Sequence, residues 1–344
     1  MRNLLLLLLF AVSVVAQETP APQLPAQDAI RIKEFYRLAS AIQDGIWPSW
    51  SKVPAPLMLV TSETEFLTHH PAPPKDMRKV GEDVYARPRQ FPSNFQATFP
   101  AFGPPAVMVV GEPANTASKT STPWLFMVMH EHFHQLQWAQ PDYLAKVDAL
   151  NLSRGDTTGM WMLNFPFPYE KPEVTRGFSQ LRDLLLHTLN EPDGTAFSKL
   201  VKEYTEQRKR FFAQLSPDER KYFTFQLWQE GMARYTEVKA AEAAQVARYH
   251  PSEEFAALPD FESFASYGAR ARSNTLSELK QADLATWKRT VVYSFGAAEG
   301  FLLDRSIQNG RTRTFNGCSR PTPISRSRSS GYFIAASSAR AFLK

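Results

Sequence analysis

The segment from His130 to His134, which reads His-Glu-His-Phe-His, constrains this chain more than any other part of it. On an α-helix, His130 and His134 lie one turn apart on the same face, so both imidazoles can bind one metal ion. Glu131 lies about 100° further round, close to where a metal-bound water would sit, and can take a proton from that water. The pattern predicts a zinc-binding helix; the alternative is a helix whose histidines are ordinary polar or hydrogen-bonded groups.

The residues around this motif predict that it lies in a helix close to a strand. The apolar run 106–110 predicts a strand, which could be a sheet edge that pairs with an extended peptide or a plain core strand. Thr122 and Pro123 predict a helix start with Thr122 as the N-cap, and the helix is expected to run to about Ala139. His132 lies about 200° round the helix from the first histidine, so we expect it to be structural or to support a ligand.

A catalytic zinc site usually has three protein ligands, and the residues just after His134 supply no obvious third one. The metzincin pattern would place a glycine and a histidine where Gln137 and Gln140 stand, which excludes that branch. A thermolysin-like spacing, judged by resemblance to that family, would place a Glu soon after His134, but the first Glu to follow it is Glu170. Three nearby carboxylates remain, none in a convincing helix: Asp142, Asp148 and Asp156.

A second motif, Glu-Gly-Met-Ala-Arg-Tyr-Thr-Glu, runs from Glu230 to Glu237. Gly231 and Ala233 would let this segment approach another backbone closely, and Glu230, Arg234 and Glu237 share one helix face. With both motifs, the chain resembles the gluzincin superfamily of zinc metallopeptidases, in which a Glu on a second helix is the third zinc ligand. The alternative for Glu230 is a place on a solvated helix face.

This resemblance implies a zincin-like α+β fold and a site that holds one Zn²⁺ per chain. It makes His130, His134 and Glu230 the zinc ligands and Glu131 the general base. Other residues are candidates for stabilising the transition state or supporting the ligands, with packing or a surface ion pair as the alternative role: Arg234, Tyr235, Glu237, His187 and Tyr293.

The two ends of the chain differ in composition from its body. Residues 1–16 carry one cation, an apolar run and small residues before Gln17, which predicts a cleaved signal peptide and a secreted or periplasmic protein without a stable membrane anchor. Residues 17–27 are Pro-rich and predict a spacer. Residues 311–344 are rich in Arg and Ser and hold the only cysteine, Cys318, which predicts a disordered or atypical tail and excludes an internal disulfide.

The charge of the chain is concentrated in this tail. The formal net charge is +5, but seven of the 39 Lys and Arg residues follow Gly310, and the tail holds no Asp or Glu. Residues 17–310 therefore carry 31 cations against 34 anions. The body is mildly acidic, and we expect it to have no nucleic-acid partner.

Residues 28–310 predict a single α+β domain. Short apolar runs broken by Pro and Gly within 48–105 predict a small irregular sheet, and 151–172 reads as a long loop. Helices are predicted at 28–44, 122–139, 173–189, 195–214, 217–249 and 284–308. The predicted function is a secreted zinc-dependent metallohydrolase, in particular a peptidase with a peptide or protein substrate. The alternative is a non-catalytic zincin-like binding or scaffold protein.

Overall fold

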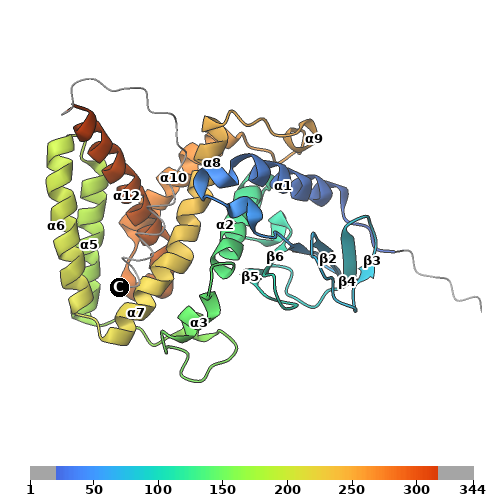
Figure 1. Cartoon of the computed structure of the whole chain (residues 1–344), viewed down its shortest axis with the longest axis horizontal. Coiled ribbons are helices and arrows are strands. Elements are labelled where there is room, and N and C mark those ends of the chain that lie inside the picture. Colours follow the sequence, from blue (N-terminus) through green and yellow to red (C-terminus); the bar gives the residue numbers. More distant parts are fainter. Residues whose placement is uncertain (1–20, 317–344) are drawn as a thin grey trace, which may run out of the picture.

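The computed structural model describes residues 21–316, with side chains described as far as residue 308, and it has an α+β architecture (Figure 1). A six-stranded sheet lies at one end and most of the helices lie at the other, with α2 (Ser121–Trp138) between them. The prediction of a small N-terminal sheet followed by a mainly helical half is confirmed. The predicted signal peptide, and the tail from residue 317 with Cys318, lie outside the described residues.

The sheet is mixed, with the strand order β3-β4-β2-β1-β6-β5. β1 pairs in parallel with β6, and the other neighbouring strands pair antiparallel. Alternate residues of the central strands enter two cores: Leu59 and Val110 pack with α1 (Ala26–Ile46) and α2, whereas Val60 and Val109 pack on the opposite face. The strands are β1 (Leu57–Val60), β2 (Thr64–Thr68), β3 (Arg78–Lys79), β4 (Val84–Pro88), β5 (Gln96–Phe99) and β6 (Val107–Gly111).

The strand predicted at 106–110 is present as β6, but it is not an edge of the sheet. β6 lies between β1 and β5 and all of its residues are buried, as is typical of an apolar run that is covered on both faces. The edge-strand interpretation of this segment was therefore wrong, and the core-strand alternative holds. The edge on this side is β5, which packs against α2.

The helical half contains the predicted helices with three differences. The predicted helix 217–249 is interrupted by a π-turn, Leu227–Gly231; the predicted helix 284–308 begins as a short helix and a 3-10 turn; and α10 was not predicted. The long helices are α1 (Ala26–Ile46), α5 (Pro172–Asn190), α6 (Gly194–Ala213), α7 (Pro217–Gln226), α8 (Met232–Val246), α10 (Phe264–Gln281) and α12 (Val291–Asn316).

Short helical segments connect these elements. α3 lies just before the stretch predicted as a long loop at 151–172, and α4 lies within it. None of the helices among residues 21–316 combines the length and the apolar character that crossing a membrane requires. The short segments are Trp50–Lys52, Pro113–Asn115, α3 (Tyr143–Asp148), α4 (Trp161–Asn164), α9 (Glu253–Ala256), α11 (Leu284–Trp287) and Lys288–Thr290.

α2 is buried along nearly its whole length between the sheet, α1 and α8. It begins at Ser121 with Thr120 at the N-cap position, so the prediction of Thr122 as the N-cap was wrong, and the Thr122 hydroxyl bonds another segment instead. That hydroxyl donates to the backbone carbonyl of Glu262 and accepts from its N–H. Tertiary contacts therefore hold the start of α2 in place.

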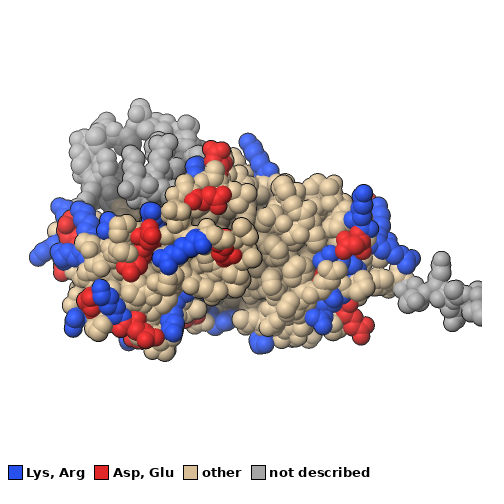
Figure 2. All heavy atoms as spheres, turned by 90° about the horizontal axis from the view of Figure 1, so that it is seen from below, with Lys and Arg blue, Asp and Glu red and all other residues tan. Residues whose placement is uncertain are grey.

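Charged side chains are unevenly spread over the face of the molecule seen in Figure 2. Acidic and basic residues are mixed at the two ends and are sparse between them. The expectation that the body has no nucleic-acid partner stays a prediction.

Candidate metal centre

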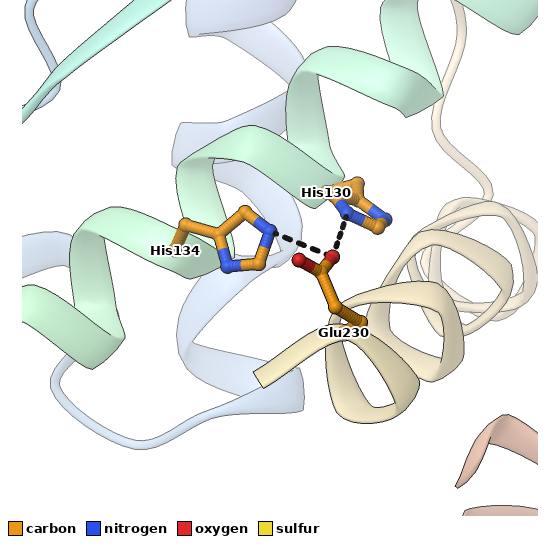
Figure 3. Close-up of side chains that lie close together, drawn as sticks. All are labelled: His130, His134 and Glu230. Atoms are coloured by element: carbon orange, nitrogen blue, oxygen red, sulfur yellow. Dashed lines mark ion pairs between the residues drawn. The ribbon is translucent and has the colours of Figure 1, made fainter. Parts of the chain in front are cut away.

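The three predicted metal ligands come together where α2 faces the π-turn (Figure 3). Glu230 Oε2 lies 3.8 Å from His130 Nε2 and 3.6 Å from His134 Nε2, and all three donor atoms lie within 4.8 Å of one another. Donors bound tetrahedrally to one zinc ion at about 2.0–2.1 Å lie roughly 3.3 Å apart. The side chains are 6%, 8% and 16% exposed, respectively, for His130, His134 and Glu230. This group can hold a metal ion.

Glu230 reaches the centre from the π-turn, which packs against α12. A Cβ atom added at Gly231 would lie 2.6 Å from Gly296 Cα and 2.9 Å from the Val292 carbonyl, so the two backbones touch. The predicted close approach at Gly231 is thus present. A π-turn adds a residue to a helical turn and redirects its side chains, and it is common at functional sites.

The carboxylate of Glu230 is ionised. Its burial opposes ionisation, but its contacts with His130 and His134 outweigh the burial and hold the pKa of Glu230 well below its usual range. An ionised carboxylate can bind a cation together with the two imidazoles once the ring nitrogens that face it have lost their protons. The alternative for Glu230, a place on a solvated helix face, does not hold, because its side chain is only 16% exposed.

His134 is oriented by Gln137, which lies one turn further along α2. The Gln137 amide nitrogen donates to the carbonyls of Trp228 (2.8 Å) and Gln229 (3.3 Å), so its amide oxygen faces His134 Nδ1 at 2.7 Å. Gln229 Nε2 also lies 3.2 Å from the same Nδ1. An amide oxygen only accepts, so the short contact with Gln137 favours the proton on Nδ1, which leaves Nε2 able to bind a metal ion.

His130 is oriented by a carboxylate instead. Glu237 Oε2 lies 3.5 Å from His130 Nδ1, and the other oxygen of Glu237 accepts from the Tyr267 hydroxyl at 2.9 Å. Arg234 Nε lies 3.6 Å from the same carboxylate. Burial disfavours charge on His130, but Glu230 and Glu237 outweigh it and raise the pKa of His130 to about 9. Glu237 therefore contacts a predicted ligand and Arg234 contacts Glu237, and their role in supporting a metal ligand stays a prediction.

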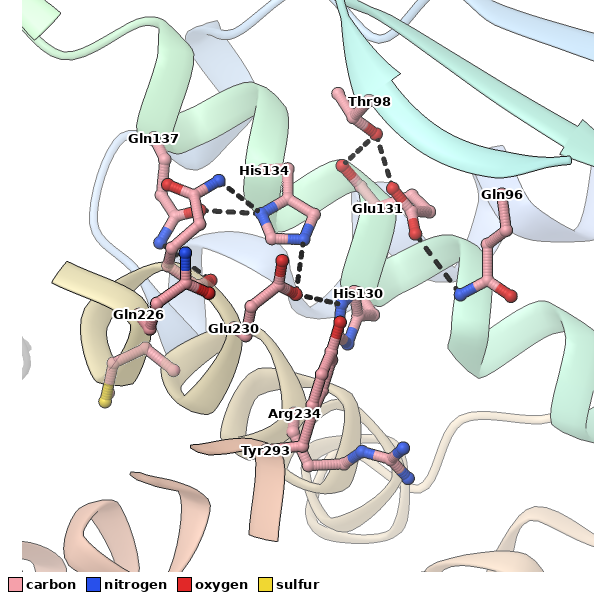
Figure 4. Close-up of polar contacts among 12 residues, drawn as sticks. Gln96, Thr98, His130, Glu131, His134, Gln137, Gln226, Glu230, Arg234 and Tyr293 are labelled. Atoms are coloured by element: carbon pink, nitrogen blue, oxygen red, sulfur yellow. Dashed lines mark hydrogen bonds and ion pairs between the residues drawn. The ribbon is translucent and has the colours of Figure 1, made fainter. Parts of the chain in front are cut away.

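Glu131 lies beside the three ligands and is held by the edge strand β5 (Figure 4). Its Oε2 accepts from the Thr98 hydroxyl at 2.7 Å, and its Oε1 accepts from the Gln96 amide at 3.3 Å. Thr98 Oγ1 is also 3.0 Å from the backbone carbonyl of Glu131. The carboxylate therefore faces β5 rather than Glu230, and it stays free of the ligand set.

Tyr293, on α12, is the one oxyanion candidate that lies at the centre. Its ring stacks on that of His130 with 6.2 Å between centroids, and its hydroxyl accepts from Arg289 Nη2 at 3.4 Å. Burial and the nearby charge of Glu230 raise the pKa of Tyr293, so the hydroxyl keeps its proton. A protonated phenol here can donate a hydrogen bond to a bound group.

The other two candidates lie elsewhere. The Tyr235 hydroxyl donates to Asp304 at 2.9 Å, and its ring packs on Gly300 and Phe301 of α12. His187 is exposed on α5, whose buried face packs on α6 and α12. The prediction that either could act at the site was wrong.

His132 is a buried structural residue. Its ring stacks on Trp50 at 4.7 Å, and its nitrogens lie 2.8 Å from the amide oxygens of Gln43 and Gln135. Burial lowers the pKa of His132 to about 4, so the ring is neutral at pH 7. The prediction that it faces away from the ligands is confirmed.

Five residues of the centre were not predicted: Gln96, Thr98, Gln137, Tyr267 and Arg289. Four of them contribute through contacts between distant segments, which spacing alone does not reveal. Gln137 is different, because its place three residues after His134 is a usable signal. Comparison of the chain with models of known protein families, with curated proteins and with solved structures finds no match.

Proposed function

We propose that this protein is a secreted, zinc-dependent metallohydrolase that hydrolyses peptide bonds. The observation that carries the proposal is the convergence of His130, His134 and Glu230 beside Glu131, a carboxylate that is not part of the ligand set. Two histidines and one glutamate are a ligand set of catalytic zinc sites, which keep one position open for water or substrate. The two Nδ1 atoms face hydrogen-bond acceptors, which suits neutral imidazoles that bind metal through Nε2.

The chain supplies a base and a donor for this reaction. Bound zinc would polarise the scissile carbonyl and lower the pKa of a bound water to about 7. Glu131 would accept a proton from that water and pass it to the leaving amine. Thr98 and Gln96 orient the Glu131 carboxylate before substrate arrives. The protonated hydroxyl of Tyr293 can donate to the oxygen on which negative charge develops.

The position of β5 supports a peptide as the substrate. Gln96 and Thr98 bring the edge of the sheet directly to the proposed base. An edge strand has backbone groups without a strand partner, and an extended peptide can pair with them. The Trp138 indole donates to the Thr98 carbonyl at 3.2 Å. A peptide would therefore pair with β5 at its Gln96 end rather than at its Thr98 end.

The proposal is tested on residues 17–344 purified without a His-tag. We expect about one zinc ion per chain, and a large loss of zinc in Glu230→Ala. Glu131→Gln should keep its zinc and lose turnover of a peptide library by about 10²–10⁴-fold, because it removes only the base. The matched control is Glu254→Gln, which removes an exposed carboxylate far from the centre and should change neither quantity.

Two results would contradict the proposal. Turnover retained in Glu131→Gln would exclude the mechanism. Zinc bound by the wild type without any chelator-sensitive cleavage would instead favour the non-catalytic binding or scaffold protein.

A further inference from the structure

Arg289 brings a positive charge to the candidate metal centre, where its guanidinium contacts Glu230. It lies in the 3-10 turn before α12, and its Nη1 contacts Glu230 Oε1 at 3.4 Å and Gln226 Oε1 at 3.3 Å. Its Nη2 donates to the Tyr293 hydroxyl at 3.4 Å. All three contacts exceed the usual 2.9–3.0 Å of an N–H···O bond. The guanidinium, with five N–H donors, is therefore only loosely satisfied by these neighbours.

Its only carboxylate partner within 4.0 Å among the described side chains is Glu230, a proposed metal ligand. In a loaded site, the charge of Glu230 is shared with the cation, so its hold on Arg289 weakens. The arginine side chain is only 20% exposed, so water compensates its charge poorly. Arg234 Nε is also buried without a hydrogen-bond partner among the described residues, but its ion-pair partner Glu237 lies outside the proposed ligand set and keeps its charge. Arg289 therefore needs a counter-charge that a substrate can bring.

We propose that Arg289 binds the C-terminal carboxylate of the substrate, so that the enzyme removes a residue from the free C-terminus of a peptide. This rests on the proposed function. One residue of extended chain spans about 3.3–3.6 Å, so a carboxylate one residue beyond the scissile bond can reach a guanidinium that contacts a metal ligand. Planar guanidinium and carboxylate groups pair through two parallel hydrogen bonds.

The reaction remains a hydrolysis. The carbon–nitrogen bond breaks, the water oxygen joins the carbonyl carbon, and the water's proton passes through Glu131 to the departing amino acid. Arg289 holds that amino acid by its carboxylate and exchanges no proton.

The test measures binding without turnover, on zinc-loaded Glu131→Gln protein. Calorimetry compares two peptides that are identical except for a free or an amidated C-terminus. We expect the free acid to bind about 10–100-fold more tightly, as for a charge-assisted hydrogen-bonded pair. Adding Arg289→Gln should abolish this preference with the zinc content unchanged, and Arg289→Lys should restore part of it.

The matched control is Lys288→Gln. It removes a positive charge from the neighbouring residue, whose side chain is exposed, and should leave the preference intact. An acid preference that survives Arg289→Gln would show that the carboxylate binds zinc itself, and it would overturn the proposal. Equal weakening of both peptides in Arg289→Gln, or no preference in the parent protein, would also overturn it. If the preference depends on Arg289 but the protein with Glu131 intact cleaves no peptide, the carboxylate-binding role of Arg289 would stand while the proposed hydrolysis fails.

Discussion

Two segments build the metal centre, and they do so by different physical means. α2 is a regular helix, so its periodicity alone puts His130 and His134 on one face. The segment that carries Glu230 is a π-turn, whose place depends on the backbone contact between Gly231 and Gly296. One half of the centre is therefore set by local structure and the other half by tertiary packing.

The same contrast holds for the groups that orient the two histidines. His134 is oriented from within α2, by the neutral amide of Gln137. His130 is oriented across the α2–α8 interface by the charged carboxylate of Glu237. The comparison implies that substitutions in the π-turn, and at the contact between Glu237 and His130, have larger effects than substitutions of groups within α2 that orient His134.

Gly231→Ala should have the largest effect. The new Cβ would meet backbone atoms of α12, which cannot rotate away as a side chain can, so we expect a loss of about 2–3 kcal/mol in the free energy of unfolding. Because the π-turn must move, zinc should be lost as well. Urea unfolding and zinc analysis measure both quantities.

Gly45→Ala is the control for this substitution. Gly45 lies in α1, with nothing within 4 Å of an added Cβ, so the change should be neutral or stabilise by about 0.5–1 kcal/mol. If Gly231→Ala kept full stability and zinc, the π-turn would not depend on its contact with α12.

Glu237→Gln should weaken zinc binding by about 10–100-fold, as expected for the loss of a group that orients a ligand. The amide keeps the size of the side chain and can still accept from Tyr267, but it removes the charge that favours a proton on His130 Nδ1. Competition with a zinc indicator measures the affinity. Glu242→Gln, on the same helix and paired with Lys239 and Arg272, should bind zinc as the wild type does.

Gln137→Ala should weaken zinc binding by less, about tenfold, because it removes a neutral acceptor. Gln140→Ala is the matched control just after the C-terminal end of the same helix, where the exposed amide donates to the Leu136 carbonyl. The same competition experiment ranks the two orienting groups. A larger effect for Gln137→Ala than for Glu237→Gln would reverse the comparison and make the local contact the stronger one.

The fold was predictable where one segment carries its own pattern. The apolar run of β6 and the helix α2 were found from local sequence, although the N-cap of α2 was misplaced, and the existence of most long helices followed from apolar periodicity. α10 was missed because half of its buried residues are small or polar, namely Gly268, Ala271 and Thr275, so its buried face does not read as an apolar stripe in the sequence. The interruption at 227–231 was missed because a π-turn leaves the helical pattern on either side intact.

The candidate site was predictable for the same reason and to the same extent. Spacing alone brought together His130, Glu131 and His134, and the resemblance added Glu230. Spacing cannot tell which side of a helix meets which neighbour, so Tyr235 was a candidate although it faces Asp304. Residues that act across interfaces, such as Arg289, become visible only when the chain is folded.

Thr98→Val should have the smallest effect and should separate catalysis from metal binding. Valine keeps the shape of threonine but removes the hydroxyl that donates to Glu131, so kcat/KM should fall by about tenfold while the zinc content stays the same. Thr98→Ser restores the hydroxyl and should recover most of the rate. Loss of zinc in Thr98→Val would mean that β5 supports the ligands on α2 as well as the base. The local half of the centre would then depend on tertiary packing too.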